Sequence, residues 1–383
     1  MSHNKAQKQF DVGGQAVLEG VMMRSPNATA VTVRRPDGSM VTKLTPFVPV
    51  KDKHPIAGKP FIRGIVNMVT MLYYGMNTLE DSTKMLGLLD EEPSRFEKWL
   101  AKKTGKSVDK IVMGIAIVLA VALALGLFML APHLFVSFLK SKGVSKIGAE
   151  LAGGGLRILL LIGYMLFCSL VPDVRKTFQY HGAEHKSVHC HESGKPLTPE
   201  NAKGFSRLHP RCGTAFLLIV FLVSIILSIC VQNYLIPDST NSILRLLARL
   251  AMLPVVAGLS YELLMGLAHS KSRLACVLRW PGMQMQRLTT REPDEKMLEC
   301  AIVSVNIVLN GFPENCPKTA EGWGVFRSYH ESEAGYVHPV DDMNDTCPSD
   351  SDTENTVSGS SDSGHCASSG LADAEQPSAE QPQ

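Results

Sequence analysis

The chain has 383 residues and a formal net charge of +2, and 45% of its residues are hydrophobic. The charge is unevenly spread, because ten Asp and Glu but no Lys or Arg follow residue 340, which leaves 38 basic and 26 acidic residues before it. The basic residues flank apolar segments rather than one soluble domain, so the pattern predicts membrane lipid as a partner and no nucleic acid. Nine cysteines at irregular spacing argue against a secreted disulfide scaffold.

Residues 1–60 are expected to form a small β-rich element on the cytoplasmic side. Apolar and polar residues alternate over 28–33 and again over 40–44, as in half-buried strands. Arg35, Pro36, Asp37 and Gly38 lie between these runs and have the chemistry of a tight turn. Residues 13–24 supply a candidate for a further strand.

Residues 61–110 are expected to form amphipathic and charged helices at the membrane surface. Over residues 61–79 the apolar side chains recur with a helical period and leave a narrow polar stripe. Such a helix can lie in the membrane interface or pack against spanning helices.

Residues 111–270 are predicted to be a transmembrane domain, since a helix needs about 20 apolar residues to cross a bilayer. The fold class is therefore mainly α, a polytopic membrane protein with about four spans. The four candidate spans are residues 111–135, 156–171, 214–236 and 243–268. Arg245 and Arg249 lie near the start of the last span, where their long side chains are expected to reach the interface.

The distribution of basic residues predicts the orientation of the chain in the membrane. The loop 172–213 and the segment after the last span are rich in Lys and Arg, whereas residues 237–242 have none. By the positive-inside rule, both termini and this histidine-rich loop are cytoplasmic. Residues 271–315 are expected to contain a soluble amphipathic helix from Pro293 to Leu309, and residues 316–383 an acidic disordered tail.

The histidine-rich loop holds the sequence H-x-x-E-H at His181, Glu184 and His185. On a helix the two histidines, four residues apart, lie on one face, where both imidazoles can reach one Zn²⁺ ion. Glu184 lies beside them, in position to act as a general base on a water molecule. This is the inverted zincin pattern, and it predicts a divalent metal, with zinc as the first choice.

Further candidate ligands complete the predicted metal shell. His209 and Cys212 can return to the site from the end of the same loop, and Glu262 is a carboxylate within a predicted span. A carboxylate in a span is usually paired or functional; Glu262 is thus either a metal ligand or the partner of a Lys or Arg. His189 continues along the same helix face and Glu192 lies one further turn along, while His189, together with His191, is placed at the margin of the site.

Three interpretations of this cluster stay open from the residues alone. In the first, His181 and His185 bind a catalytic metal and Glu184 activates water. In the second, Cys190, His209 and Cys212 join one of the two motif histidines in a closed structural zinc site. In the third, the histidines cover lipid headgroups and bind no metal.

Several segments together resemble the YqhQ-like family of bacterial membrane proteins. The matching segments are residues 13–24, 180–186, 209–214, 253–262 and 286–293. The function of this family is unknown, although its members are often described as metal-dependent enzymes. The resemblance covers residues 11–310 and implies the same membrane fold, while the residues after about 315, and the additional histidines His189 and His191, lie outside it.

The sequence therefore predicts a metal-dependent, hydrolytic enzyme at the cytoplasmic face of the membrane. The expected ligands are His181, His185, His209, Cys212 and Glu262, with Glu184 as the catalytic base. A membrane lipid or a peptide is the expected substrate class. The alternative is a non-catalytic membrane scaffold or accessory protein with a structural or regulatory metal site, and the oligomeric state stays open.

Overall fold

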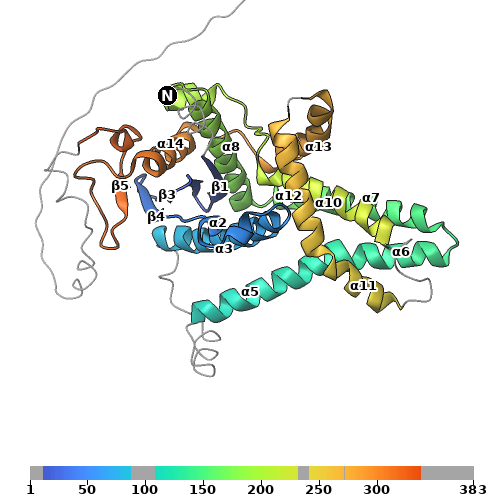
Figure 1. The fold of residues 1–383 in the computed structure, drawn as a ribbon. Coiled ribbons are helices and arrows are strands. Elements are labelled where there is room, and N and C mark those ends of the chain that lie inside the picture. Colours follow the sequence, from blue (N-terminus) through green and yellow to red (C-terminus); the bar gives the residue numbers. More distant parts are fainter. Residues whose placement is uncertain (1–11, 88–107, 232–240, 271, 338–383) are drawn as a thin grey trace, which may run out of the picture. The chain divides into compact units, whose positions relative to one another are not determined.

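The computed structural model describes residues 12–87, 108–231, 241–270 and 272–337 (Figure 1). The described part is mainly helical and contains one antiparallel sheet of five strands. Its strands follow one another in chain order across the sheet: β1 (Gly13–Val17), β2 (Gly20–Arg24), β3 (Ala28–Arg34), β4 (Met40–Pro46) and β5 (Gly324–Phe326).

The two segments in which apolar and polar residues alternate form strands, as predicted. The expected strands over 28–33 and 40–44 are β3 and β4, which pair in register with Val31 opposite Lys43. Residues 13–24 give two strands rather than one, because the chain reverses between Val17 and Gly20. Glu19 in this reversal has a positive φ of 48°.

The fifth strand corrects the boundary predicted for the C-terminal tail. β5 pairs with the start of β4, and its Phe326 is completely buried. Residues 316–326 therefore belong to the folded part, although their distance from the other strands gave no sign of this. The rest of the predicted acidic tail, after residue 337, lies outside the described residues.

Two helices from distant parts of the chain pack against the sheet: α8 (Pro172–Glu192) and α14 (Glu295–Asn310) (Figure 1). α14 begins where the Asp294 side chain accepts a hydrogen bond from the Met297 backbone N–H, and ends before Gly311, whose φ is +80°. Eleven of its sixteen residues are buried. The sequence predicts one apolar face for this helix, but α14 is buried on more than one side, because the sheet packs against one side and α8 against another.

α3 (Ile62–Met85) confirms the helix predicted from residues 61–79 and extends it by about two turns. It contacts α12 (Leu253–His269) as well as β1 and β3. Leu72 and Tyr73 are each 64% exposed on its surface. An apolar face exposed to this degree suits the membrane-surface position that the sequence predicts.

Three described helical segments are long and apolar enough to cross a membrane. The first runs from Gly114 to Ser141 and consists of most of α5 (Val108–Leu125), the π-helical turn η2 (Gly126–Leu130) and α6 (Ala131–Ser141). The second is α7 (Lys146–Cys168), and the third, Ile243–Leu267, joins α11 (Ser242–Ala251) to α12. These segments match three of the four predicted spans.

The remaining predicted span corresponds to α10 (Gly213–Cys230). Its apolar portion within the described residues, Leu217–Cys230, is shorter than a bilayer requires. The predicted continuation to residue 236 lies largely outside the described residues. The other described helices are α2 (Val50–Lys53), η1 (Pro55–Gly58), α9 (Pro199–Lys203), α13 (Arg273–Thr289) and η4 (His330–Ser332).

The structure corrects the expectation that Arg249 reaches the membrane interface. Arg249 is only 5% exposed, and its guanidinium binds both carboxylate oxygens of Glu150 on α7 at 2.8 and 2.9 Å. Lys140 donates a further hydrogen bond of 3.0 Å to the same carboxylate. The charge of Arg249 is thus neutralised by an acidic partner among the apolar helices rather than by solvent.

Candidate metal centre

The H-x-x-E-H motif lies in the second half of α8, where the helix turns from exposed to buried. Pro172 occupies the first turn, where a missing N–H costs no hydrogen bond. Glu184 and His185 are both buried. Buried polar side chains need hydrogen-bond or metal partners, so the groups that contact this face of α8 define the candidate site.

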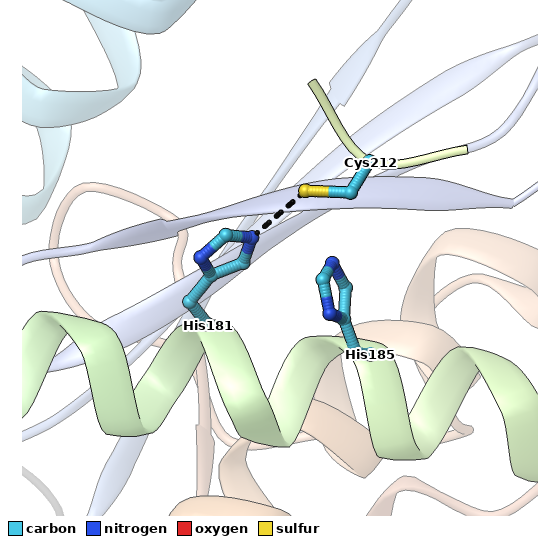
Figure 2. A group of neighbouring side chains, drawn as sticks. All are labelled: His181, His185 and Cys212. Carbon is cyan, nitrogen blue, oxygen red and sulfur yellow. Dashed lines mark hydrogen bonds between the residues drawn. The ribbon is translucent and has the colours of Figure 1, made fainter. Parts of the chain in front are cut away.

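His181, His185 and Cys212 form the first group of ligand atoms, with one atom of each residue within 4.8 Å of the others. Figure 2 shows both imidazoles rising from the same face of α8 toward the Cys212 thiol, which comes from a separate segment. His181 Nε2 lies 3.2 Å from Cys212 Sγ. The structure thus brings together three of the five predicted ligands.

Backbone carbonyls fix the orientation of both imidazoles. Nδ1 of His181 lies 2.8 Å from the carbonyl oxygen of Thr289, and Nδ1 of His185 lies 2.5 Å from that of Arg207. Because a carbonyl oxygen only accepts hydrogen bonds, each Nδ1 carries the proton. In the neutral form of each ring, the lone pair of Nε2 then faces the site, as in metal-binding histidines whose other nitrogen is held by the protein.

Glu184 lies beside these two lone pairs. Its Oε1 accepts a hydrogen bond of 3.1 Å from the Gly14 N–H of β1, while Oε2 lies 3.5 Å from His185 Nε2 and 3.9 Å from His181 Nε2. Gly14 allows this approach, because a Cβ there would lie 2.2 Å from the Met22 carbonyl oxygen and 3.1 Å from Glu184 Cγ. Two acceptor atoms that face each other repel unless a proton or a cation lies between them.

Cys212 is positioned at the start of α10. It is the N-cap residue of this helix, and its Sγ accepts a hydrogen bond of 3.5 Å from the Thr214 N–H. The positive end of the helix dipole favours negative charge at such a position. The Cys212 sulfur is therefore placed to act as an anionic ligand.

The predicted ligand His209 belongs to a second group, with His189 and Glu192, whose ligand atoms also lie within 4.8 Å of one another. Gln286 on α13 holds the His209 backbone by two hydrogen bonds, both 2.8 Å long, to its N–H and its carbonyl oxygen. Burial lowers the pKa of both His189 and His209 below the usual value. Burial thus favours the neutral form that binds metals.

Glu262 is placed differently from the other predicted ligands. Its carboxylate accepts hydrogen bonds of 2.8 and 2.6 Å from the Arg63 guanidinium and one of 3.0 Å from the Phe61 N–H. A cavity of about 470 Å³ lies beside this ion pair. Among the described residues Glu262 belongs to neither ligand group, and of its two predicted roles the structure gives it the ion pair.

Glu19 and Arg24, two charged residues of the segment 13–24, and Cys190 of the histidine-rich loop have partners outside the two ligand groups. Glu19 forms an ion pair of 2.8 Å with Lys176 of α8, and the guanidinium of Arg24 lies 4.8 Å from the centre of the Phe47 ring. The thiol of Cys190 donates to the Pro196 carbonyl and packs in the hydrophobic core. The closed zinc site that included Cys190 is therefore not assembled.

Sequence reasoning missed the residues that orient the ligands. Arg207 and Thr289 act through backbone carbonyls, which carry no side-chain signal. Gln286 is a buried amide on an otherwise ordinary helix. Its contact with His209 spans 77 residues of sequence, so no local pattern reveals it.

The fold and these two groups define a membrane-associated helical protein with residues that could hold a metal ion. Residues 59–311 match the family model described as "Protein of unknown function (DUF1385)". The chain is also 34% identical over 312 residues to the "Uncharacterized protein YqhQ" of Bacillus subtilis (strain 168), covering 81% of this chain and 95% of that protein. No solved structure gives a significant match.

The chain therefore belongs to this family of unknown function, and the resemblance drawn from the sequence motifs is confirmed. The match includes both ligand groups and Gln286. It ends near Gly311, so the β5 strand lies beyond the family model.

Proposed function

We propose that the chain is a metal-dependent hydrolytic enzyme whose centre is formed by His181, His185 and Cys212. The observation that carries this proposal is the convergence of three ligand atoms within 4.8 Å, two of them imidazole lone pairs fixed by backbone carbonyls. Catalytic zinc sites use three protein ligands and keep a fourth position for water, whereas structural sites use four. The donor set of two imidazoles and one thiolate fits Zn²⁺.

Glu184 is the general base in this proposal. A bound divalent metal would supply Lewis acidity that makes a nearby water molecule acidic near neutral pH. Glu184 Oε2 lies within 4 Å of both imidazole nitrogens, at the edge of the space that the metal would fill. The Gly14 N–H holds the other carboxylate oxygen, so that Oε2 stays directed at the site and can accept a proton.

The proposed location is the cytoplasmic face of the bacterial inner membrane, with several spans and both termini in the cytoplasm. The three apolar helices support membrane association, and the Lys and Arg content of residues 172–213 supports the orientation. A site on the segment that joins two spanning helices would meet substrates at the membrane surface. A lipid or a membrane-bound peptide is the substrate class that fits this position.

The proposal is tested on the full chain purified in detergent. Metal analysis should find zinc in the wild type and a loss of one equivalent in H181A/H185A. After exchange to Co²⁺, the wild type should show a thiolate-to-cobalt charge-transfer band that Cys212→Ser removes. Acetohydroxamate, a small chelating anion, should shift the cobalt spectrum if a coordination position is open.

Glu184→Gln separates catalysis from metal binding. In vesicles that contain ester-linked lipids and peptides, the variant should keep its metal and lose hydrolysis by about 10²–10⁴-fold, the usual contribution of a general base. Wild-type protein that carries no metal at Cys212, or a Glu184→Gln variant as active as wild type, would overturn the proposal.

A second candidate is a non-catalytic scaffold stabilised by the same metal. It is favoured by burial, since the side chains of His185 and Glu184 are only 2% and 7% exposed. The metal would then fasten α8 to the start of α10 and, through Thr289, to the end of α13. A cobalt spectrum with the thiolate band but no response to acetohydroxamate would select this candidate.

A further inference from the structure

His189, Glu192 and His209 lie next to the first ligand group, and they form a group of their own. His189 and Glu192 come from the last turn of α8, and His209 comes from the segment before α10. The two parts of the site are thus joined by tertiary structure and not by sequence proximity. We infer that this group binds a second divalent metal ion beside the first, an inference that goes beyond the proposed function and does not depend on it.

The spacing of the ligand atoms supports this inference. One atom of each residue lies within 4.8 Å of the other two, and His209 Nε2 lies 3.5 Å from Glu192 Oε2. That distance is long for a charge-assisted hydrogen bond. It suits two ligands of one metal ion, because nitrogen and oxygen atoms bound tetrahedrally at about 2.0–2.2 Å lie about 3.4 Å apart.

Supporting contacts orient two of the three ligands, whereas Nδ1 of His209 accepts a hydrogen bond of 3.3 Å from the Arg211 N–H, a contact that must open when a metal binds Nε2. Nε2 of His189 lies 3.0 Å from the Leu208 carbonyl oxygen, so it carries the proton and leaves the lone pair on Nδ1. The Arg211 guanidinium contacts Oε1 of Glu192 and leaves Oε2 on the side of His209. The two hydrogen bonds from Gln286 fix the backbone of His209. Such supporting contacts are typical of metal ligands.

Imidazole rings of the first ligand group lie next to imidazole rings of the second. The ring centres of His181 and His185 are 4.5 Å apart, those of His185 and His209 5.7 Å, and those of His209 and His189 4.5 Å. Four imidazoles from two chain segments therefore form one row, with Cys212 at one end and Glu192 at the other.

The two groups differ in chemistry, and this difference makes them separable by experiment. The first contains a thiol, which favours Zn²⁺, whereas the second has only nitrogen and oxygen donors, which suit Zn²⁺, Co²⁺, Mn²⁺ or Fe²⁺. Only the first group can give a thiolate-to-cobalt charge-transfer band. Cobalt bound to the second group contributes d–d absorption alone.

The test is a Co²⁺ titration of the metal-free full chain in detergent, with bound cobalt measured by metal analysis. The wild type should bind two equivalents, and H189A/E192Q should bind one and keep the charge-transfer band. Cys212→Ser should lose the band and still bind cobalt at the second group. His191→Ala is the matched control, because it changes the same helix at a residue outside both groups.

The outcomes separate this inference from the proposed function. Wild-type protein that binds one equivalent, unchanged in H189A/E192Q, would overturn the second site and leave the first intact. Cobalt binding without a charge-transfer band, abolished by H189A/E192Q, would establish the second site while the proposed first centre fails. Circular dichroism of each variant checks that the helices are retained, and Glu192→Gln alone, which keeps the shape of the side chain, should still lower the bound cobalt.

Discussion

Two buried glutamates, in different regions of the molecule, have opposite surroundings. Glu150 lies among the apolar helices with its side chain 2% exposed, and Arg249 and Lys140 both bind its carboxylate. Glu184 lies between the sheet and the histidine cluster with its side chain 7% exposed. Within the described residues, no Lys or Arg forms an ion pair with Glu184; its near neighbours are a backbone N–H and two imidazoles.

The comparison indicates what each carboxylate does. A buried negative charge is costly unless a positive charge accompanies it. The protein supplies that charge to Glu150 from its own side chains, which is the behaviour of a structural ion pair. Among the described residues it places no Lys or Arg beside Glu184, whose carboxylate faces two imidazoles and a backbone N–H instead. The positive charge beside Glu184 is therefore expected either from a proton on one of these imidazoles or from the metal ion of the proposed centre.

The largest effect is expected from breaking the structural pair. Glu150→Ala leaves Arg249 buried without its partner and should lower the free energy of unfolding by about 3–5 kcal/mol. Urea unfolding in detergent micelles measures this change. Leu151→Ala is the control, since this neighbour on the same helix is 55% exposed. A loss for Glu150→Ala that is no larger than for Leu151→Ala would show that the pair contributes little.

A smaller loss of stability is expected where α8 packs against the backbone around Arg291, near the Thr289 carbonyl that accepts from His181. A Cβ on Gly182 would lie 2.1 Å from the Arg291 carbonyl oxygen. Gly182→Ala should therefore push these backbones apart, lower the free energy of unfolding by about 1–3 kcal/mol and reduce metal occupancy. Gly163→Ala in α7 is the matched control, because nothing lies within 4 Å of a Cβ there. Equal stability of the two variants would mean that the close approach at Gly182 is not required.

A change of opposite sign is expected at Glu184 in the metal-free protein. Glu184→Gln removes a buried charge that has no cationic partner, and it keeps an oxygen for the Gly14 N–H. The free energy of unfolding without metal should rise by about 1 kcal/mol, since burying an unpaired charge is unfavourable. Glu150→Gln should lower it under the same conditions. If Glu184→Gln and Glu150→Gln both lowered the free energy of unfolding of the metal-free chain, the proposed difference between the two glutamates would be wrong.

The smallest effect concerns reactivity rather than stability. Burial raises the pKa of the Cys300 thiol to about 12, so at pH 8 almost none of it is the reactive thiolate. Cys300 should react with maleimide far more slowly than the exposed Cys276 and should gain reactivity only as the pH approaches 12. Peptide mass spectrometry after timed labelling measures both sites. Fast labelling of Cys300 at pH 8 would contradict a dry interface between α14 and the sheet.

Much of the local structure follows from the sequence. The alternation over residues 28–33 and 40–44 fixes strands because successive side chains of a strand point to opposite faces. The spacing of His181 and His185 places both on one helix face, and this relation holds in α8 whatever packs against it. Runs of apolar residues identify, by length and composition, the helices that could span a membrane.

The choice among distant partners was decided only by the tertiary structure. Cys212 joins His181 and His185, whereas His209, three residues earlier, joins His189 and Glu192. Glu262 is bound by Arg63, about 200 residues away, and Arg249 by Glu150. Periodicity determines which face of an element a residue occupies, but the packing of the whole chain determines what that face meets. The sequence by itself therefore determined the ligand-bearing helix, and the fold decided which residues complete each group.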